Sequence, residues 1–197
     1  MNYLAHIHLA KLSDTSMVGN FLGDFVKGSE LSHLDEEHQH GIKLHRRIDS
    51  FTDHHKSIKN LRESFPKELR RMSGVVIDIH FDHLLCQHWQ SFETESLDDL
   101  LSRFYSKLAN FDSPVKGRFQ AVRKGLLEYR WLSDYQALSS CERAYYQIEK
   151  RLKGKVVFAG AANEFVQNNK TLFSTHFLLF YPQLIQFVKA ESKSILN

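Results

Sequence analysis

An all-α fold is predicted for this chain by three observations. Apolar residues recur at intervals of three and four along much of the 197-residue sequence, as they do on one face of a helix. Only three prolines and nine glycines are present, too few for the many turns of an all-β fold. No alternating apolar and polar pattern competes with the helical one. We therefore expect a compact bundle of about seven to nine helices, with residues 1–197 forming a single domain.

Capping residues and helix breakers justify the expected elements in order. Ser13 or Asp14 can cap the first helix, and Gly28 can end it. Pro114 suits the first turn of a later helix, and Pro182 should kink or divide the last one. Helices are expected at about 13–27, 37–53, 57–64, 67–89, 96–110, 114–131, 134–153 and 163–193.

Composition excludes several classes of protein. Hydrophobic residues make up 42% of the chain and charged residues 25%, which is ordinary for a soluble globular protein. A net charge of +3 does not indicate nucleic-acid binding. The N-terminal segment lacks the features of a signal peptide, and no apolar run approaches the length of a membrane span. Cys86 and Cys141 lie in apolar sequence, which indicates buried thiols. We expect a cytoplasmic protein that binds neither nucleic acid nor membrane.

Basic residues gather in two places. Residues 43–71 contain nine basic and four acidic side chains. A second cluster contains Lys116, Arg118, Arg123 and Lys124. Such patches attract an acidic partner or a phosphate. A solvated surface is an equally good interpretation of the charge pattern alone.

Polar pairs with helical spacing indicate a metal site. Three expected helices each carry two polar residues four positions apart in apolar sequence: Asn20 with Asp24, His45 with Asp49, and Asp78 with Asp82. Residues with this spacing share a face, and buried carboxylates need a cation. Bundles hold metals with His and Asp side chains from facing helices, and this mixed set suits Mn²⁺, Fe²⁺, Mg²⁺ or Zn²⁺. A network of salt bridges to Arg46 and Arg47 is the weaker alternative, because two arginines would have to neutralise four or five carboxylates.

Two histidines near the N-terminus bear on this site. His6 and His8 lie two residues apart, so in a helix they point to different faces. One of them is expected to reach the site and the other to be a core or capping histidine. The chain has no glycine-rich phosphate loop, no nucleophile elbow and no H-E-x-x-H motif.

Four segments together resemble a known family. They are "MNYLAHIHLA", "GNFLGDFVKG", "GIKLHRRIDSFTD" and "IDIHFDHLLCQHW". In order and spacing they are similar to the bacterial acyl carrier protein phosphodiesterases, over about the first ninety residues. The resemblance implies a divergent HD-domain-like fold, although no His-Asp dipeptide occurs in this chain. It also implies hydrolysis of the phosphodiester between 4′-phosphopantetheine and the serine of holo-acyl carrier protein, with a divalent cation, Mn²⁺ favoured.

Candidate roles follow from this chemistry, in which a metal-activated water attacks phosphorus. Asp24, His45, Asp49 and Asp78 are the expected metal ligands, and Asp82 or His6 is a further ligand or orients one. Arg46 is expected to hold the phosphate, because a guanidinium matches its oxygens. His83 is the candidate acid for the leaving serine oxygen.

The expected partner is the acidic acyl carrier protein, which the basic patches would attract. The oligomeric state stays open. Two alternatives also remain at this stage. One is a metal-dependent phosphohydrolase that acts on a nucleotide or another small phosphoester. The other is a non-catalytic helical module whose polar pairs form a structural ion network.

Overall fold

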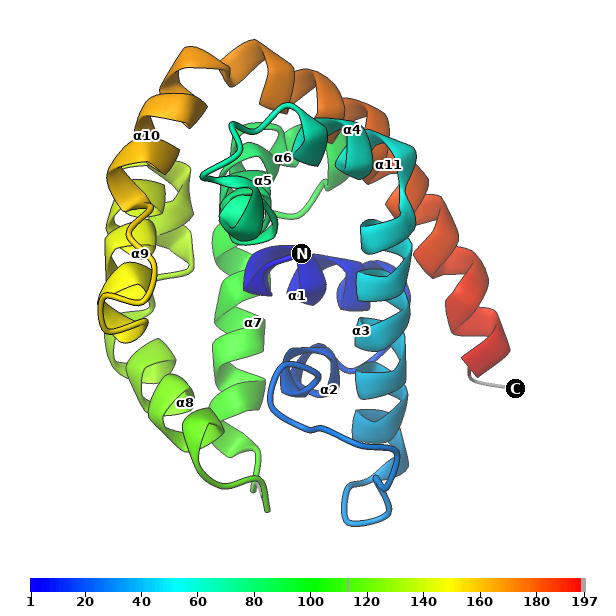
Figure 1. Ribbon diagram of the computed structural model, residues 1–197. Helices are drawn as coiled ribbons and strands as arrows, with labels where there is room; N and C mark the ends of the chain where they lie inside the picture. The colour runs from blue at the N-terminus through cyan, green and yellow to red at the C-terminus, as the bar shows by residue number, and fades with distance from the viewer. Residues whose placement is uncertain (113, 196–197) are drawn as a thin grey trace.

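Helices form all the regular secondary structure of residues 1–112 and 114–195, which are the residues that the computed structural model describes (Figure 1). The all-α prediction is confirmed. Two 3-10 turns, η1 (Arg70–Met72) and η2 (Ser133–Gln136), precede α5 and α9. The α-helices are α1 (Tyr3–Leu12), α2 (Met17–Leu22), α3 (Glu36–His54), α4 (Lys56–Glu63), α5 (Ser73–Gln87), α6 (Trp89–Phe92), α7 (Leu97–Asn110), α8 (Arg118–Tyr129), α9 (Leu138–Arg151), α10 (Ala159–Asn168) and α11 (Lys170–Ile195).

The first helix, α1, lies at the centre of the molecule, where it packs against α2, α3, α5 and α11 (Figure 1). Every residue from Leu4 to Ala10 is buried. A helix that is buried on all sides has no amphipathic stripe, so periodicity does not predict it. Its first turn is capped by α5, because Asp82 accepts hydrogen bonds from the backbone N–H groups of Leu4 and Ala5, at 2.9 and 3.1 Å.

The helix predicted at 13–27 is wrong at both ends. Ser13 belongs to the end of α1, where its hydroxyl donates to the carbonyl of Leu9. Ser16 is the residue that caps α2. The helix ends at Leu22, and i→i+3 hydrogen bonds from Gly23 to Asn20 and from Phe25 to Leu22 form the turn that leads into the next loop. There the guanidinium of Arg46 donates hydrogen bonds to loop carbonyls at Val26 and Gly28.

Two glycines allow α2 and α3 to pack closely. A Cβ on Gly41 would lie 2.6 Å from the backbone nitrogen of Asn20, and one on Gly19 would lie 2.8 Å from the Cα of His38. Real Cβ contacts are longer than this, so a larger residue at either position would push the helices apart. The close approach places Asn20 against α3, which carries His45.

Three later helices begin further along the chain than predicted. The helix expected from residue 67 begins at Ser73, and those expected from 114 and 134 begin at Arg118 and Leu138. Before α5, i→i+3 hydrogen bonds join Pro66 to Leu69 and Leu69 to Met72. A three-residue repeat puts Leu69 and Met72 on one side, and both are buried there. Core packing thus favours the tighter turn over an α-helix.

The predicted last helix is two helices, divided at Asn169 and not at Pro182. The side chain of Asn169 donates a hydrogen bond to the carbonyl of Phe165, which closes α10. Pro182 lies within α11 on its exposed face. Water can reach the carbonyl that loses its N–H partner at an exposed proline, so the helix continues past it.

One hydrophobic cluster runs from α1 to α11 and includes buried residues from most helices. Its aromatic part surrounds the middle of α11, where Phe173, Phe177, Phe180 and Tyr181 are fully buried. None of the described helices is both long enough and apolar enough to cross a bilayer. Several buried polar residues lie on α1 or contact it, namely His6, His8, Asn20 and Asp82.

Candidate metal centre

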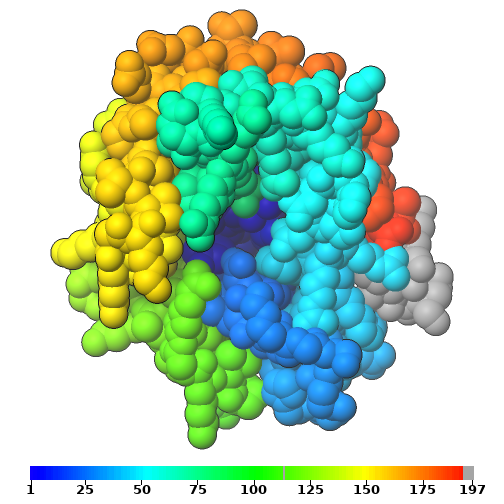
Figure 2. All heavy atoms as spheres, in the orientation of Figure 1, coloured from blue at the N-terminus to red at the C-terminus, as the bar shows by residue number. Residues whose placement is uncertain are grey.

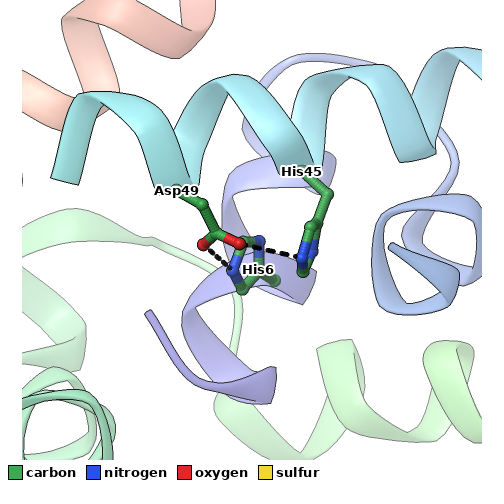
Figure 3. A group of neighbouring side chains, drawn as sticks. All are labelled: His6, His45 and Asp49. Carbon is green, nitrogen blue, oxygen red and sulfur yellow. Dashed lines mark hydrogen bonds and ion pairs between the residues drawn. The ribbon is translucent and has the colours of Figure 1, made fainter. Parts of the chain in front are cut away.

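Three side chains meet between α1 and α3 (Figure 3). His6 comes from α1, and His45 and Asp49 come from α3; their potential ligand atoms all lie within 4.8 Å of one another. Nε2 of His6 lies 3.2 Å from one oxygen of Asp49, and Nε2 of His45 lies 3.1 Å from the other. Both histidines are buried, whereas 44% of the Asp49 side chain is exposed. The cluster therefore has a buried imidazole side and a carboxylate that reaches solvent.

Asn20 determines which nitrogen of His6 carries the proton. Nδ1 of His6 lies 2.8 Å from the amide oxygen of Asn20, which can only accept. The proton is therefore on Nδ1, and a neutral ring presents the lone pair of Nε2 to the carboxylate of Asp49. Two lone pairs at this distance repel each other, and a cation bound by both removes the repulsion. A hydrogen bond at the other ring nitrogen is also the usual support of a metal-binding histidine.

The protonation states of the cluster suit a cation. Burial lowers the pKa of His6, and the neighbouring His45 lowers it further, against the opposing effect of Asp49. Burial acts to raise the pKa of Asp49, but the hydrogen bond from His45, the nearby His6 ring and the Met1 ammonium outweigh it and hold the pKa well below its ordinary value. At neutral pH the cluster thus combines a neutral imidazole with an ionised carboxylate, as metal ligation requires.

The distances within the cluster also fit a metal. Ligands about 2.1 Å from a cation and at right angles are separated by roughly 3 Å, which matches both His–Asp distances. The ring of His45 is oriented by packing, since its Nδ1 is buried without a hydrogen-bond partner among the described residues. A Cβ on Gly23 would lie 2.2 Å from this ring, so only glycine leaves room for it. Two imidazoles and a carboxylate suit a divalent transition metal.

Asp78 is connected to the cluster through the N-terminal ammonium of Met1. This nitrogen lies 3.2 Å from Asp78 and 3.7 Å from Asp49. Burial acts to lower the pKa of the ammonium, but the carboxylates of Asp78 and Asp49 outweigh burial and raise it. Two of the predicted ligands therefore converge on one positive charge, as carboxylates do around a cation.

Asp24 lines a cavity of about 540 Å³ beside the cluster, together with Asp78 and Met1. It follows the end of α2, so the predicted helical pairing of Asn20 with Asp24 is not formed. The space-filling view shows a hollow with α1 at its base, surrounded by atoms of α2, α3, α5, α8 and α9 (Figure 2). Asp24 and Asp78 thus face a space that a small molecule could enter.

Two of the predicted catalytic residues make contacts elsewhere. Arg46 uses its guanidinium to hold the carbonyls of Val26 and Gly28, at 3.1 and 2.7 Å. Nδ1 of His83 donates to the carbonyl of Tyr135, at 2.7 Å. Burial lowers the pKa of His83, although this hydrogen bond opposes the change. Their assignments as phosphate ligand and general acid stay predictions.

The third predicted catalytic residue, Asp82, is fully buried at the first turn of α1. Burial raises its pKa to about 7, and the N–H groups of Leu4 and Ala5 offset burial only in part. Because both carboxylate oxygens contact α1, Asp82 holds the helix that carries His6. This geometry favours the interpretation of Asp82 as an orienting residue over that of a ligand.

Two groups that contact this cluster were not predicted from the sequence. One is Asn20 in its role as partner of His6, and the other is the ammonium of Met1. The signal for Asn20 was an amide within apolar sequence, since a buried amide needs a hydrogen-bonding partner. No sequence signal could place the ammonium, because its location depends on how α1 packs.

Comparisons with known proteins extend over nearly the whole chain. A family model described as acyl carrier protein phosphodiesterase matches residues 1–184, well beyond the first ninety. The protein of that name from Pectobacterium atrosepticum is 32% identical over 97% of this chain and 99% of its own length. Those from Serratia proteamaculans and Yersinia pestis are each 33% identical, over 96% and 99% of this chain and 98% and 100% of their own lengths.

No solved structure matches the chain, so the HD-like relationship of the fold stays a prediction. The family itself does not depend on that relationship. It follows from a model that spans most of the sequence and from relatives that align from end to end. On this evidence the chain belongs to the acyl carrier protein phosphodiesterase family.

Proposed function

We propose that this protein hydrolyses the phosphodiester between 4′-phosphopantetheine and the serine of holo-acyl carrier protein. Water adds to phosphorus, the bond to the serine oxygen breaks, and the products are 4′-phosphopantetheine and apo-acyl carrier protein. The names of the relatives support this substrate. The observation that carries the proposal is the cluster of His6, His45 and Asp49 beside a cavity that Asp78 also lines.

The proposal includes a divalent cation held by His6, His45 and Asp49, and Mn²⁺ is the favoured ion. Asp78 and Asp24 are the further candidate ligands from the cavity wall. When bound, such an ion neutralises charge on phosphate oxygens and lowers the pKa of a water molecule. The chain itself would orient the ligands: Asn20 holds His6 through Nδ1, and the capping hydrogen bonds of Asp82 fix α1.

An acidic carrier protein would dock on the basic surface near the start of α5. Arg62, Arg70 and Arg71 line a surface hollow there, and Val75, in the next turn, lines the cavity beside the metal centre. Opposite charges speed such an encounter, and salt screens them. The value of kcat/KM for the carrier protein should therefore fall as ionic strength rises. Turnover that is indifferent to salt would contradict this docking.

Mass spectrometry of intact carrier protein tests the proposed reaction. Incubation with holo-acyl carrier protein and Mn²⁺ should remove the mass of the phosphopantetheine arm. A chelator should stop the reaction, and added Mn²⁺ should restore it. An unchanged carrier protein with each of Mn²⁺, Mg²⁺ and Fe²⁺ would refute the proposal. Nucleotides and small phosphodiesters, assayed without carrier protein, test the alternative substrates.

A further inference from the structure

The cavity beside the proposed metal centre is lined by side chains of both charges. Its acidic lining residues are Asp24, Asp78 and Asp134, and Asp78 shares the Met1 ammonium with Asp49 of the cluster. The lining also includes three arginines from the helices across the hollow: Arg118 at the start of α8, and Arg143 and Arg151 on α9. In the described residues, no ion pair joins any of these three arginines to a carboxylate. Unpaired guanidinium groups in a cavity are suited to binding an oxyanion.

Arg118 is the arginine most directly tied to the centre. Its guanidinium lies 3.5 Å from the hydroxyl of Tyr3, in the first turn of α1, and above the ring of Phe25 at 5.4 Å. These contacts direct the group toward the turn that also holds the Met1 ammonium. Burial and the nearby Asp24 raise the pKa of Tyr3 to about 12, against Arg118 and Arg151. Tyr3 therefore keeps its proton at neutral pH and adds a hydroxyl to the same wall.

The rest of the cavity fits a flexible chain of amides and methylene groups. Val75, Ile79 and Val122 supply apolar surface, and Asn2 and Gln147 supply amide groups. A volume of about 540 Å³ lies within the range of roughly 300–1,000 Å³ that is usual for small-molecule sites. Atoms of α1 form the base of the hollow, behind the helices that surround it (Figure 2). A folded carrier protein could not reach that base, whereas an extended arm could.

We infer that this cavity binds the phosphopantetheine arm, with Arg118 contacting the phosphate from the side opposite Asp78. The inference rests on the proposed function for the identity of the arm. It places the phosphate between the cluster and an arginine wall, and the amide-rich arm along α5, α8 and α9. Arg143 and Arg151 extend the positive wall, although the Arg143 guanidinium also donates to the hydroxyl of Ser140 at 2.7 Å.

Binding of free 4′-phosphopantetheine in the presence of Mn²⁺ tests the inference without any need for turnover. Arg118→Ala should weaken this binding by roughly tenfold to a hundredfold, the effect of losing a charged hydrogen-bond partner. Pantetheine without its phosphate should bind weakly to both proteins. Arg118→Lys should recover only part of the affinity, because it restores charge without the planar fork.

Lys124→Ala is the matched control, since it removes a positive charge from the same helix at an exposed hollow elsewhere. It should leave 4′-phosphopantetheine binding unchanged, and Arg118→Ala should leave the affinity for apo-acyl carrier protein and for Mn²⁺ unchanged. Wild-type 4′-phosphopantetheine affinity in Arg118→Ala would overturn the inference, as would an equal loss of affinity for the apo protein. If the wild type leaves holo-acyl carrier protein unchanged, the proposed function is refuted. The binding comparison still tests the inference in that case, because it does not require turnover.

Discussion

Two buried histidines on α1, His6 and His8, have similar hydrogen-bonding partners, but we expect them to have different roles. Each has Nδ1 at a short distance from an oxygen: the amide oxygen of Asn20 at 2.8 Å for His6, and the hydroxyl of Tyr181 at 2.7 Å for His8. Each also has Nε2 near a carboxylate, since His6 lies 3.2 Å from Asp49 and His8 lies 3.7 Å from Glu93. The two sites differ in what neutralises that carboxylate.

Glu93 is neutralised by the chain itself. Lys11, on the same helix as His8, pairs with it, and the N–H groups of Thr94 and Glu95 donate to it. Only 4% of the Glu93 side chain is exposed. Asp49 has no lysine or arginine partner in the described part of the chain, and it reaches solvent beside a second histidine. The only cation that the described chain brings to Asp49 is the Met1 ammonium, at 3.7 Å and shared with Asp78. A buried histidine next to a carboxylate is therefore structural where a side-chain cation pairs directly with that carboxylate, and a candidate for chemistry where none does.

Removal of the two carboxylates should separate the sites most clearly. Asp49→Ala should lower both Mn²⁺ affinity and kcat/KM by more than about a hundredfold, since it removes one of the proposed metal ligands. Glu93→Gln should leave both nearly unchanged. Calorimetry with Mn²⁺ and the carrier-protein mass assay measure the two quantities. Wild-type Mn²⁺ affinity in Asp49→Ala would remove the cluster as the metal centre.

Glu93 should affect stability instead of metal binding. Glu93→Gln should cost about 2 kcal/mol at pH 7, because it weakens hydrogen bonds to a charged group. Burial acts to raise the pKa of Glu93, but Lys11 and the N–H groups outweigh it and lower the pKa from 4.5 to about 2. A lowered folded-state pKa means that this stabilisation is present above about pH 4.5 and is lost as the pH falls toward 2. Urea unfolding of wild type and variant should converge over that interval; a constant difference would argue against the pair.

Replacing Asn20, the Nδ1 partner of His6, should have a smaller effect on Mn²⁺ binding than replacing Asp49. Asn20→Ala should weaken Mn²⁺ binding by roughly tenfold to a hundredfold, because the ring loses the contact that fixes its tautomer. Asn20→Asp keeps an acceptor and should retain most of the affinity. If both variants bind Mn²⁺ as the wild type does, His6 is not held in the way that the structure indicates.

The Nδ1 partner of His8 should give the smallest effect. Tyr181→Phe keeps the ring packing and removes only the hydroxyl, so the free energy of unfolding should fall by about 1 kcal/mol. Mn²⁺ affinity and kcat/KM should not change. A loss of metal affinity in Tyr181→Phe would show that the two faces of α1 are coupled, and that the division between a structural and a chemical histidine is too simple.

Local pattern was enough to predict part of the candidate site. His45 and Asp49 are four residues apart on α3, and their spacing alone placed them on one face. The same reasoning misplaced Asp24, because α2 ends before it. For Asp82 it left open a ligand and an orienting residue, and it did not predict the contact with α1 that favours the orienting role. Periodicity describes the faces of one helix and contains no information on what an opposite helix brings to them.

The sequence by itself determined the helical class of the fold, the i, i+4 pair on α3, and the four segments that indicate the family. These features depend on the backbone geometry of single helices or on residue identity in order. The tertiary structure decided that His6, and not His8, joins His45 and Asp49. It also decided that Arg118 and Asp78 line the same cavity. Helix α1 is buried on every side, so its orientation depends on packing and on the cap from Asp82, and both act between residues far apart in the chain.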